Sequence, residues 1–480
     1  MSPDPRNPVV VGNVCHIAVP KGRHTFRTVT QLSLCDTLKY TALVFSIGKV
    51  IEANRLPKNV VFSNRFDARR YVLDRKGYDR FRQESKRLSA SDKYKVKIIT
   101  DVANYYDRLN LHKLENILKQ IKCDEATVTK LNQILIRWSQ QQSFGIPVGT
   151  DASRLLAEAM LIDADKELSS HRIKFIRYVD DYRIFCGSAE RAYEAMQILD
   201  SSLRREGLFL NSGKTRLVDL ALERDEEEDD EGEFEPIDLD HKIERTVKIQ
   251  TGRYTSRIAK FYKYPGKDAV KKLREINLKE LLAEIRRPNT PEERLKLYVK
   301  AAIYAESPTF ESLKEILDLY PHLIPYVCDA IIKETSESGT IQEIQFKRQA
   351  IAHFRSVFKL FQRNDYFRIQ SARLLCSIDD RCGEFLSKQI LNLDASREVL
   401  FSQVLYLMGD RTPRSHFNEM LSRYFSYGYA ARTSIAFMLA GSVILKDEER
   451  KAQLRHLQRS ETDAFLNNLL KRTPPPPPTR

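Results

Sequence analysis

Several features are scarce in this chain of 480 residues, and each scarcity excludes a class of protein. No apolar stretch approaches the roughly 20 residues that a membrane helix needs, so we expect no membrane partner. The N-terminal residues MSPDPRNPVVVGN lack a charged segment followed by an apolar one, so we expect no secretory signal. The seven cysteines form no Cys-x-x-Cys pair, which argues against a disulfide framework or a zinc ribbon and favours a cytoplasmic location.

The net charge of +14 is unevenly distributed. Residues 61–100 hold twelve Lys or Arg against five Asp or Glu, whereas Glu223–Glu235 holds ten acidic residues in thirteen positions. A basic segment of ordinary complexity indicates a partner that carries phosphates, although a solvated helix face would have the same composition. The acidic run is typical of a flexible, self-repelling loop, with mimicry of nucleic acid as the alternative.

The length of the chain predicts two or three domains, because 480 residues are too many for one ordinary core. Before about residue 220, β-like runs alternate with amphipathic stretches, which indicates an α/β or α+β domain. The expected strands include 43–51, 95–106 and 173–180. The expected helices are 111–121 and 152–168, the second capped by Thr150 or Asp151.

The character of the sequence changes at about residue 268. From there on, amphipathic segments follow one another with short polar breaks, which is typical of stacked antiparallel helix pairs, although no exact period is visible. The last residues, TPPPPPTR (473–480), form a polyproline tail that we expect to be disordered or extended.

Two adjacent aspartates, Asp180 and Asp181, interrupt the strand-like segment RYVDDYRIF (177–185). Strands on both sides would place the two carboxylates at a hairpin tip, where like charges are unfavourable unless a cation such as Mg²⁺ compensates them. Asp101, after the apolar run Val96–Ile99, is the candidate for a further ligand. Carboxylates from neighbouring strands that bridge two Mg²⁺ ions are suited to in-line phosphoryl transfer. An aspartate pair alone is weak support, since most such pairs lie in surface turns.

Four segments, in chain order, resemble the palm motifs A, B, C and D of a reverse transcriptase. They are DVANYY from Asp101, FGIPVGTDAS (144–153), YVDD (178–181) and GLFLNSGKT (207–215). The resemblance covers roughly residues 40–220 and implies an α+β fold with an antiparallel sheet and helices. The predicted domains are reverse-transcriptase-like fingers and palm (1–220), an acidic flexible loop (221–245), an all-α HEAT-like repeat or thumb-like domain (246–472) and the disordered tail (473–480).

The resemblance implies a metal site built from motifs A and C. Asp101 and Asp180 would be the principal ligands of two Mg²⁺ ions, for which Mn²⁺ could substitute. Asp181 would be a supporting carboxylate, and the backbone carbonyl of Val102 would complete a metal shell. All three aspartates would then be catalytic.

Further residues would bind the substrate. Tyr106 occupies the family's steric-gate position, where an aromatic ring collides with a ribose 2′-hydroxyl, so the implied substrate is a dNTP; a core aromatic at a helix start is the alternative. Tyr178 would pack beside the primer end. Arg65, Arg69 and Arg70 resemble finger residues that clamp the triphosphate.

Motifs B and D would also approach the nucleotide. Gly145 and Gly149 would let the backbone come close to a base pair or nucleotide, and Pro147 would stiffen the turn into the helix, although an ordinary helix-entry loop would look the same. Lys214 would approach the triphosphate and protonate the leaving pyrophosphate; a surface lysine at a turn is the alternative.

One residue of motif B departs from the family pattern and narrows the kind of reverse transcriptase that the chain resembles. Phe144 stands where retroviral and intron-encoded enzymes usually carry a glutamine. No protease, RNase H, integrase or zinc-finger endonuclease pattern is visible. The segment GIPVGTDASRLLAEAML instead resembles motif B of bacterial abortive-infection and defence-associated reverse transcriptases, which also join the polymerase to a C-terminal helical repeat domain. The resemblance implies antiphage defence by DNA synthesis, with assembly into a homo-oligomer.

The template and the primer stay open at this point. One reading is untemplated synthesis from a protein hydroxyl, which leaves single-stranded DNA attached to the protein. Another is the copying of an associated noncoding RNA by a retron-like or group II intron-like enzyme. A third is a catalytically silent scaffold that binds nucleic acid, which the loss of a metal aspartate would mark. The helical half would guide single-stranded product or form the subunit interface.

Overall fold

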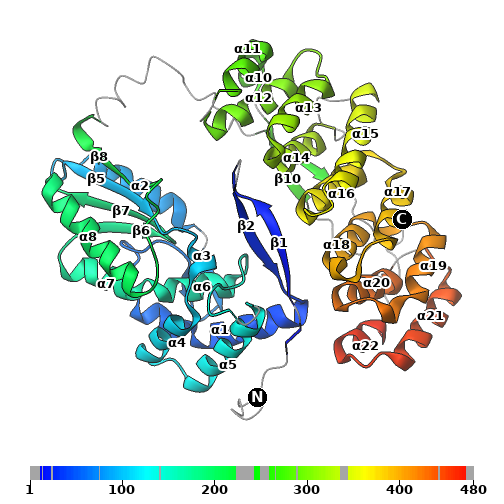
Figure 1. The fold of residues 1–480 in the computed structure, drawn as a ribbon, viewed down its shortest axis with the longest axis horizontal. Coiled ribbons are helices and arrows are strands. Elements are labelled where there is room, and N and C mark those ends of the chain that lie inside the picture. The colour runs from blue at the N-terminus through cyan, green and yellow to red at the C-terminus, as the bar shows by residue number, and fades with distance from the viewer. Residues whose placement is uncertain are drawn as a thin grey trace. The chain divides into compact units, whose positions relative to one another are not determined.

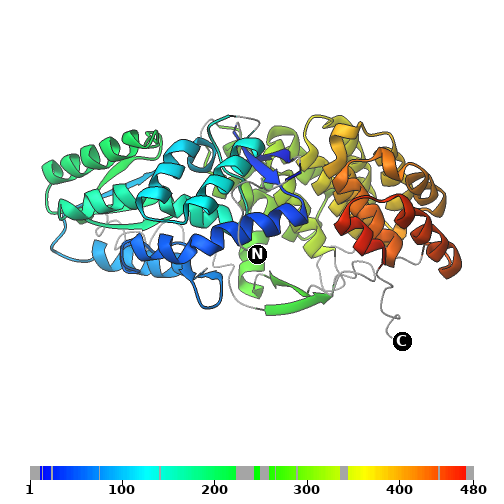
Figure 2. The same ribbon diagram turned by 90° about the horizontal axis from the view of Figure 1, so that it is seen from below.

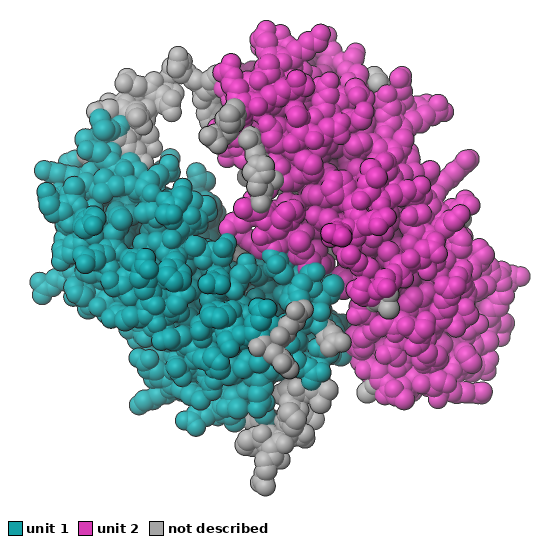
Figure 3. Space-filling model, in the orientation of Figure 1, with its two compact units in different colours: residues 1–16, 28–235 teal, residues 17–27, 236–480 magenta. Residues whose placement is uncertain are grey.

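The computed structural model describes residues 11–12, 14–22, 25–74, 76–139, 142–222, 243–248, 259–264, 266–287, 290–335, 344–441 and 444–471. The chain forms two compact units, one of Met1–His16 with Thr28–Glu235 and one of Ile17–Arg27 with Pro236–Arg480 (Figure 3). The acidic run Glu223–Glu235 and the polyproline tail 473–480 lie outside the described residues, so the expected loop and tail stay predictions, as do the domain boundaries.

The first unit is built around a four-stranded antiparallel sheet. Its strand order is β6 (Lys174–Tyr178), β7 (Asp181–Cys186), β5 (Val96–Asp101) and β8 (Arg216–Asp219). Alternate side chains point to opposite faces. One face packs on α8 (Ala189–Arg205), and the other on α2 (Gly77–Ser89) (Figure 1). The strands expected within 95–106 and 173–180 are therefore present.

Helices fill the remainder of the first unit, namely α4 (Leu111–Gln120), α5 (Glu125–Trp138), α6 (Asp151–Met160) and α7 (Ile162–Ser170). The two helices expected at 111–121 and 152–168 are present, the second as the consecutive α6 and α7. Thr150 caps α6, because its Oγ1 accepts a hydrogen bond of 3.1 Å from the Ser153 N–H.

Residues 43–51, which we expected to form a strand, lie inside the helix α1 (Leu34–Asn54). Ser33 caps this helix by accepting a hydrogen bond from the Asp36 N–H. One helical face is buried, through Tyr40, Val44, Ile47 and Ile51. The strand prediction is wrong, because burial of an apolar face at helical spacing outweighs the β preference of valine and isoleucine.

Among the described residues, three two-stranded sheets accompany the main one. They pair β1 (Cys15–Pro20) with β2 (Phe26–Gln31), β3 (Arg65–Asp67) with β4 (Val72–Asp74), and β9 (Ile243–Lys248) with β10 (Ala259–Tyr264). The last pair corrects the expectation that residues from 246 onward are all helical. Its segments, IERTVK and AKFYKY, contain β-branched and aromatic residues that favour strands.

The second unit continues as a succession of helices (Figures 1 and 2, from green to red). They are α10 (Lys267–Arg274), α11 (Leu278–Ile285), α12 (Glu292–Tyr304), α13 (Phe310–Leu319), α14 (Ile324–Glu334), α15 (Ile344–Leu360), α16 (Asp365–Ile378), α17 (Cys382–Leu391), α18 (Glu398–Met408), α19 (Arg414–Ser422), α20 (Tyr429–Gly441), α21 (Asp447–Ser460) and α22 (Ala464–Lys471).

These helices are stacked in two rows. The even-numbered helices from α10 to α22 contact one another in succession, and α11, α15, α17 and α21 each pack on the next helix. One apolar core runs through the whole stack from Leu273 to Leu470. Such contacts between successive neighbours are typical of helical repeats; the HEAT-like assignment stays a prediction. In the part of the chain that the structure describes, no helix has both the length and the apolar character needed to cross a bilayer.

Candidate active site

The two adjacent aspartates lie at a hairpin turn between β6 and β7. Tyr178 pairs with Asp181, so Val179 and Asp180 form a two-residue turn. Val179 has a φ of +56°. Positive φ at the first turn residue is normal for such hairpins, but there it favours glycine, and a β-branched residue is strained. The structure therefore holds a strained residue directly before Asp180.

The third carboxylate comes from the neighbouring strand. Asp101 ends β5, and its partner in the β5–β7 ladder is Asp181. Residues directly opposite each other in an antiparallel pair have Cβ atoms about 4.5–5.5 Å apart. The strand ends are also joined by a hydrogen bond of 3.2 Å from the Val102 N–H to the Asp180 carbonyl. The register thus brings the predicted carboxylates of motifs A and C together.

The negative charges act on one another. Burial is the main cause that raises the pKa of Asp181 to about 6; Arg183 opposes the rise, and the charges of Asp180 and Asp101 add to it. Burial and the neighbouring charges disfavour the ionised form of this carboxyl group. A cation that binds nearby stabilises the ionised form. This electrostatic environment fits a cation site.

The donor set fits a divalent metal ion that binds together with its substrate. The Oδ1 of Asp101 is buried and has no hydrogen-bond partner. Among the described residues, no group of three or more His, Cys, Asp or Glu side chains is arranged to hold a metal ion by itself. Mg²⁺ usually takes one or two carboxylates and completes its shell with waters and substrate phosphates. Asp101, Asp180, Asp181 and the carbonyl of Val102 are the groups that would hold such ions.

The ammonium group of Lys214 neutralises part of the negative charge of this site. Its Nζ donates to Oδ2 of Asp101 at 2.7 Å, and this bond is the main cause that raises the pKa of Lys214. The turn that carries it is tied to β5, because the Asn211 N–H donates to the Asp101 carbonyl at 2.9 Å and the Thr100 and Thr215 hydroxyls lie 2.6 Å apart. The predicted motif D lysine therefore contacts a predicted metal ligand.

The predicted steric gate and motif B are neighbours. Tyr106 lies in α3 (Tyr105–Arg108), and its carbonyl accepts a hydrogen bond of 3.1 Å from the Ile146 N–H. The Gly145 N–H donates to the Leu109 carbonyl at 2.9 Å. The side chain of Tyr106 is half-buried, with its ring centroid 5.6 Å from that of Tyr105.

The two glycines of motif B adopt conformations that favour glycine. Gly145 has a φ of +89°, and a Cβ atom there would lie 3.4 Å from the Asp107 carbonyl oxygen. Gly149 has a φ of +113°. Pro147 between them is buried. The loop thus approaches α3 through backbone atoms, and a side chain at either glycine would be strained.

Tyr178 packs on α2. Its ring centroid lies 5.2 Å from that of Tyr78 and 5.9 Å from that of Phe81. The ring is half-buried, and burial is the main cause that raises the pKa of Tyr178. The role of Tyr178 beside a primer end stays a prediction.

The three predicted triphosphate arginines have different surroundings. Arg65 is only 7% exposed; its Nη2 pairs with Oε1 of Glu52 at 2.7 Å, and its Nη1 donates to the Leu56 carbonyl at 2.8 Å. Burial lowers the pKa of Arg65. These contacts do not favour a triphosphate role for Arg65, because its two Nη atoms already bind neighbouring groups of the fold; the role stays a prediction. Arg69 and Arg70 are exposed in the β3–β4 turn.

Sequence reasoning missed a buried ion-pair network beneath the turn. Arg177 is fully buried and binds Asp165 and Glu158 at 2.6 and 2.9 Å, while Arg55 binds the same Glu158 at 2.8 Å. Burial alone would raise the pKa of Glu158, but the two arginines outweigh it and lower that pKa. The signal in the sequence was an arginine inside an apolar strand and two acids on an apolar helical face.

Arg183 was also missed. It stands two residues after Asp181, hence on the same face of β7. Its Nη1 donates to the Ser85 hydroxyl at 2.6 Å, and its guanidinium lies 4.6 Å from the Phe81 ring centroid. This fixed cation lowers the pKa of Asp181 against the effect of burial.

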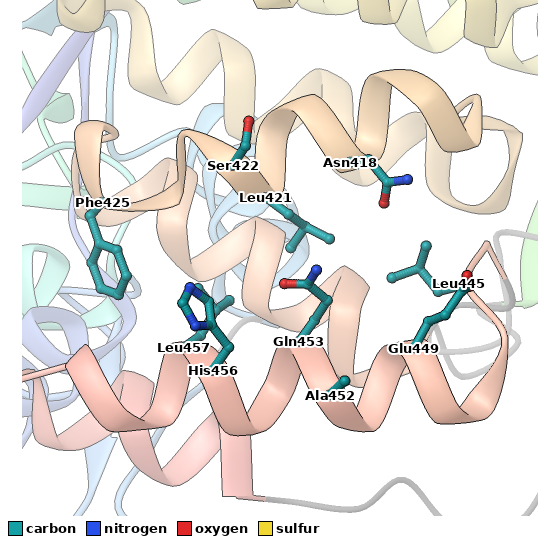
Figure 4. A pocket seen from close by; sticks show the side chains of 10 residues that line it. All are labelled: Asn418, Leu421, Ser422, Phe425, Leu445, Glu449, Ala452, Gln453, His456 and Leu457. Carbon is teal, nitrogen blue, oxygen red and sulfur yellow. The ribbon is translucent and has the colours of Figure 1, made fainter.

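A separate groove of about 560 Å³ lies in the second unit between α19 and α21. The side chains of Leu421 and Gln453 point toward one another across it (Figure 4). Among its ten described lining residues, Glu449 is the one carboxylate. The groove therefore has no counterpart of the paired aspartates.

The sheet presents Asp101 and Asp181 from two adjacent strands, the arrangement that the resemblance to a reverse transcriptase palm implied. Residues 19–261 match the family model described as "Reverse transcriptase (RNA-dependent DNA polymerase)". This match covers half of the chain, and the protein belongs to the reverse transcriptase family. It is a nucleotidyltransferase of that family, with the predicted reverse-transcriptase-like fold, and family members generally depend on divalent metal ions. No curated protein matches the chain.

Solved telomerase structures are among those similar to the chain. They are apo telomerase from Candida tropicalis (TM-score 0.32), telomerase from Candida albicans with a TWJ fragment of telomeric RNA (0.34), and the Candida tropicalis enzyme with such a fragment (0.33), each at 12% identity. The matches cover 85%, 82% and 88% of this chain and 68%, 66% and 65% of the telomerase chains. Similarity at this level carries no argument about function.

Proposed function

We propose that this protein is a DNA polymerase of reverse-transcriptase type that acts in antiphage defence by abortive infection. It would transfer dNTPs onto a 3′-hydroxyl or onto a protein hydroxyl. The observation that supports catalysis is the cross-strand pair Asp101–Asp181 next to Asp180, with one oxygen of Asp101 buried and unpaired.

The aspartates would form the catalytic centre. Two Mg²⁺ ions, or Mn²⁺ in their place, would be held by Asp101, Asp180, Asp181 and the Val102 carbonyl, and when bound they would activate the attacking hydroxyl and stabilise the leaving pyrophosphate. The register of β5 and β7 supports this assignment, because it holds the ligands close before any ion binds.

The surrounding residues would select and orient the nucleotide. Tyr106 would exclude a ribose 2′-hydroxyl, and the backbone of Gly145 next to it would bound the same pocket. Lys214 would leave Asp101 and donate a proton to the pyrophosphate. Arg69 and Arg70, whose side chains are exposed, are the candidate triphosphate ligands that we retain from the fingers.

The defence role is supported by the motif B sequence together with the stacked helices of the second unit. These helices would guide single-stranded DNA product or form the interface of a homo-oligomer. The family description, an RNA-dependent DNA polymerase, favours a second candidate, in which the enzyme copies an associated noncoding RNA.

A nucleotide-incorporation experiment tests the proposal. Purified protein is incubated with Mg²⁺ and each labelled dNTP, first without template or primer and then with an RNA template and DNA primer. Products are analysed with and without protease and RNase. Label that stays with the protein and resists RNase indicates protein-primed, untemplated synthesis, whereas label that needs RNA indicates the second candidate.

Two variants complete this experiment. Asp180→Ala should abolish incorporation, and Asp200→Asn should leave it unchanged, because Asp200 pairs with Arg204 on the exposed side of α8. No incorporation by the wild-type protein under any condition, or full activity of Asp180→Ala, would contradict the proposed catalysis. Loss of phage protection in cells that express Asp180→Ala, but not Asp200→Asn, would support the defence role.

A further inference from the structure

The turn that contains Asp180 accepts a hydrogen bond from the buried guanidinium of Arg177. The Nη1 of Arg177 donates to the Val179 carbonyl at 2.6 Å. Its Nε and Nη2 bind Asp165 at 2.9 and 2.6 Å, and Nη1 also binds Glu158 at 2.9 Å. The backbone of Arg177 is fixed as well, because its N–H donates to the Val60 carbonyl at 2.8 Å. Arg177 therefore has little freedom to move.

The bond to the Val179 carbonyl has a specific consequence for the turn. Val179 and Asp180 are the two central residues, so this carbonyl belongs to the peptide that joins them. The two common types of two-residue hairpin turn differ in the orientation of that peptide. Of these two residues Val179 has a positive φ, +56°, and Asp180 does not. A donor on the Val179 carbonyl selects one orientation and thereby places Asp180.

The hydrogen bond from Arg177 also stabilises the strained backbone conformation of Val179. A β-branched residue at positive φ is disfavoured, and such a conformation persists where its surroundings hold it. A charge-assisted hydrogen bond from a buried, fully paired guanidinium is among the stronger interactions available for that purpose. The residue best suited to this turn, glycine, is absent from it.

The network reaches a second part of the site. Glu158 lies on α6, the helix that begins directly after the motif B loop, and Asp165 lies on α7. The hydroxyl of Tyr182, next to Asp181, donates to the same Asp165 at 3.0 Å. One buried set of charges thus joins the hairpin to the helix that follows the nucleotide loop.

We infer that Arg177 is a positioning residue, which orients the Val179–Asp180 peptide and so sets Asp180 against Asp101 for metal binding. This inference rests on the proposed metal-dependent polymerase. Arg177 touches neither substrate nor metal in this scheme. Its loss would weaken the affinity for metal, and so raise the Mg²⁺ requirement, while the fold of the active site is kept.

The test measures the Mg²⁺ concentration that gives half-maximal dNTP incorporation, together with the thermal midpoint of the metal-free protein. Arg177→Lys keeps the charge but loses the planar set of donors, so this Mg²⁺ concentration should rise at least tenfold. The matched control is Arg55→Lys. Arg55 binds the same Glu158, and its other partners are Glu52 and the Ser63 and Asn64 carbonyls, not the turn.

Arg55→Lys should lower the thermal midpoint about as much as Arg177→Lys but leave the Mg²⁺ dependence within about twofold of the wild-type value. A purely structural network predicts the same Mg²⁺ dependence for both variants, and that result would overturn the inference. If the wild-type protein itself incorporates no dNTP, the proposed function fails instead, so the two failures are distinguishable.

A second pair of variants probes the turn directly. Val179→Gly adopts positive φ without strain, so the double variant Arg177→Lys/Val179→Gly should recover most of the lost Mg²⁺ affinity. Val179→Pro cannot adopt positive φ and should lose at least a hundredfold in activity, even if Arg177→Lys does not fold. Absence of rescue by glycine, or wild-type activity of the proline variant, would overturn the inference.

Discussion

Asp101 and Asp181 stand directly opposite each other on β5 and β7, and Lys214 binds Asp101 at 2.7 Å. Like charges at directly opposed positions destabilise an antiparallel pair. The first unit therefore carries an arrangement that costs stability in the absence of a cation, and the predictions below follow from it.

Removal of one charge should stabilise the metal-free protein. The pKa of Asp181 is raised from 3.8 to about 6, so the protonated form is favoured in the folded state. Its stabilising contribution is present below about pH 4 and is lost as the pH rises through about 6. Asp181→Asn mimics the protonated form and should gain on the order of 1–2 kcal/mol at pH 8, after allowance for partial exposure.

Thermal unfolding of both proteins without metal checks this prediction. The difference in midpoint should be near zero at about pH 4 and reach about 2–6 °C at pH 8. A higher midpoint for the wild-type protein at pH 8 would contradict it. Mg²⁺ at millimolar concentration should raise the wild-type midpoint at pH 8 more than that of Asp181→Asn.

The Lys214 ammonium occupies a lone pair of Asp101 that a metal ion would use. Lys214→Ala should therefore lower the Mg²⁺ concentration for half-maximal activity about threefold to tenfold, while kcat falls about tenfold to a hundredfold through loss of the proton donor. Steady-state incorporation assays across a Mg²⁺ series separate the two effects. Lys214→Arg is the control that keeps the charge; a rise in the Mg²⁺ requirement of Lys214→Ala would refute the competition.

Discrimination between sugars should depend on the ring at position 106. Tyr106→Ala should raise the ratio of kcat/KM for an NTP to that for a dNTP by about tenfold or more, because the collision with the 2′-hydroxyl is removed. Tyr106→Phe keeps the ring and should keep the wild-type ratio. Tyr71→Ala, at an exposed tyrosine of the β3–β4 turn, is the matched control. An unchanged ratio in Tyr106→Ala would assign the residue to the core alone.

Substitution of Arg65 should affect stability, whereas substitution of Arg69 should affect the binding of dNTPs. Arg65→Ala removes one of the two arginines that pair with Glu52, together with the donor to the Leu56 carbonyl, and should cost about 1–3 kcal/mol of unfolding free energy. Arg69→Ala removes an exposed side chain, so stability should stay unchanged while KM for dNTPs rises about tenfold. Denaturant unfolding and steady-state kinetics on the two variants give the comparison. Equal stability of Arg65→Ala and the wild-type protein would show that the ion pair is dispensable.

Much of the site could be predicted because its signals are local. A strand–Asp–Asp–strand segment forms a hairpin through alternation of apolar residues, and Thr150 caps α6 through its own neighbours three residues away. The strand prediction for 43–51 failed for the opposite reason. Valine and isoleucine favour strands locally, but the partners that bury one face of α1 lie elsewhere in the chain.

The role of each arginine required the tertiary structure. Arg65, Arg69 and Arg70 look alike in the sequence, and only the ion pair with Glu52, thirteen residues before Arg65, separates the first from the others. The sequence shows Arg177 inside an apolar strand, but not that Asp165, Glu158 and the Val179 carbonyl are the groups that surround it. Ion pairs between distant residues depend on packing, which local propensity does not encode.

The sequence by itself determined the order and spacing of the motifs, hence the family and the chemistry that three aspartates support. Only the tertiary structure decided that Asp101 faces Asp181, that Lys214 binds Asp101, and that Arg177 donates to the Val179 carbonyl of the turn. The physical reason is that side-chain chemistry is carried by residue type, whereas strand register and burial arise when distant segments pack together.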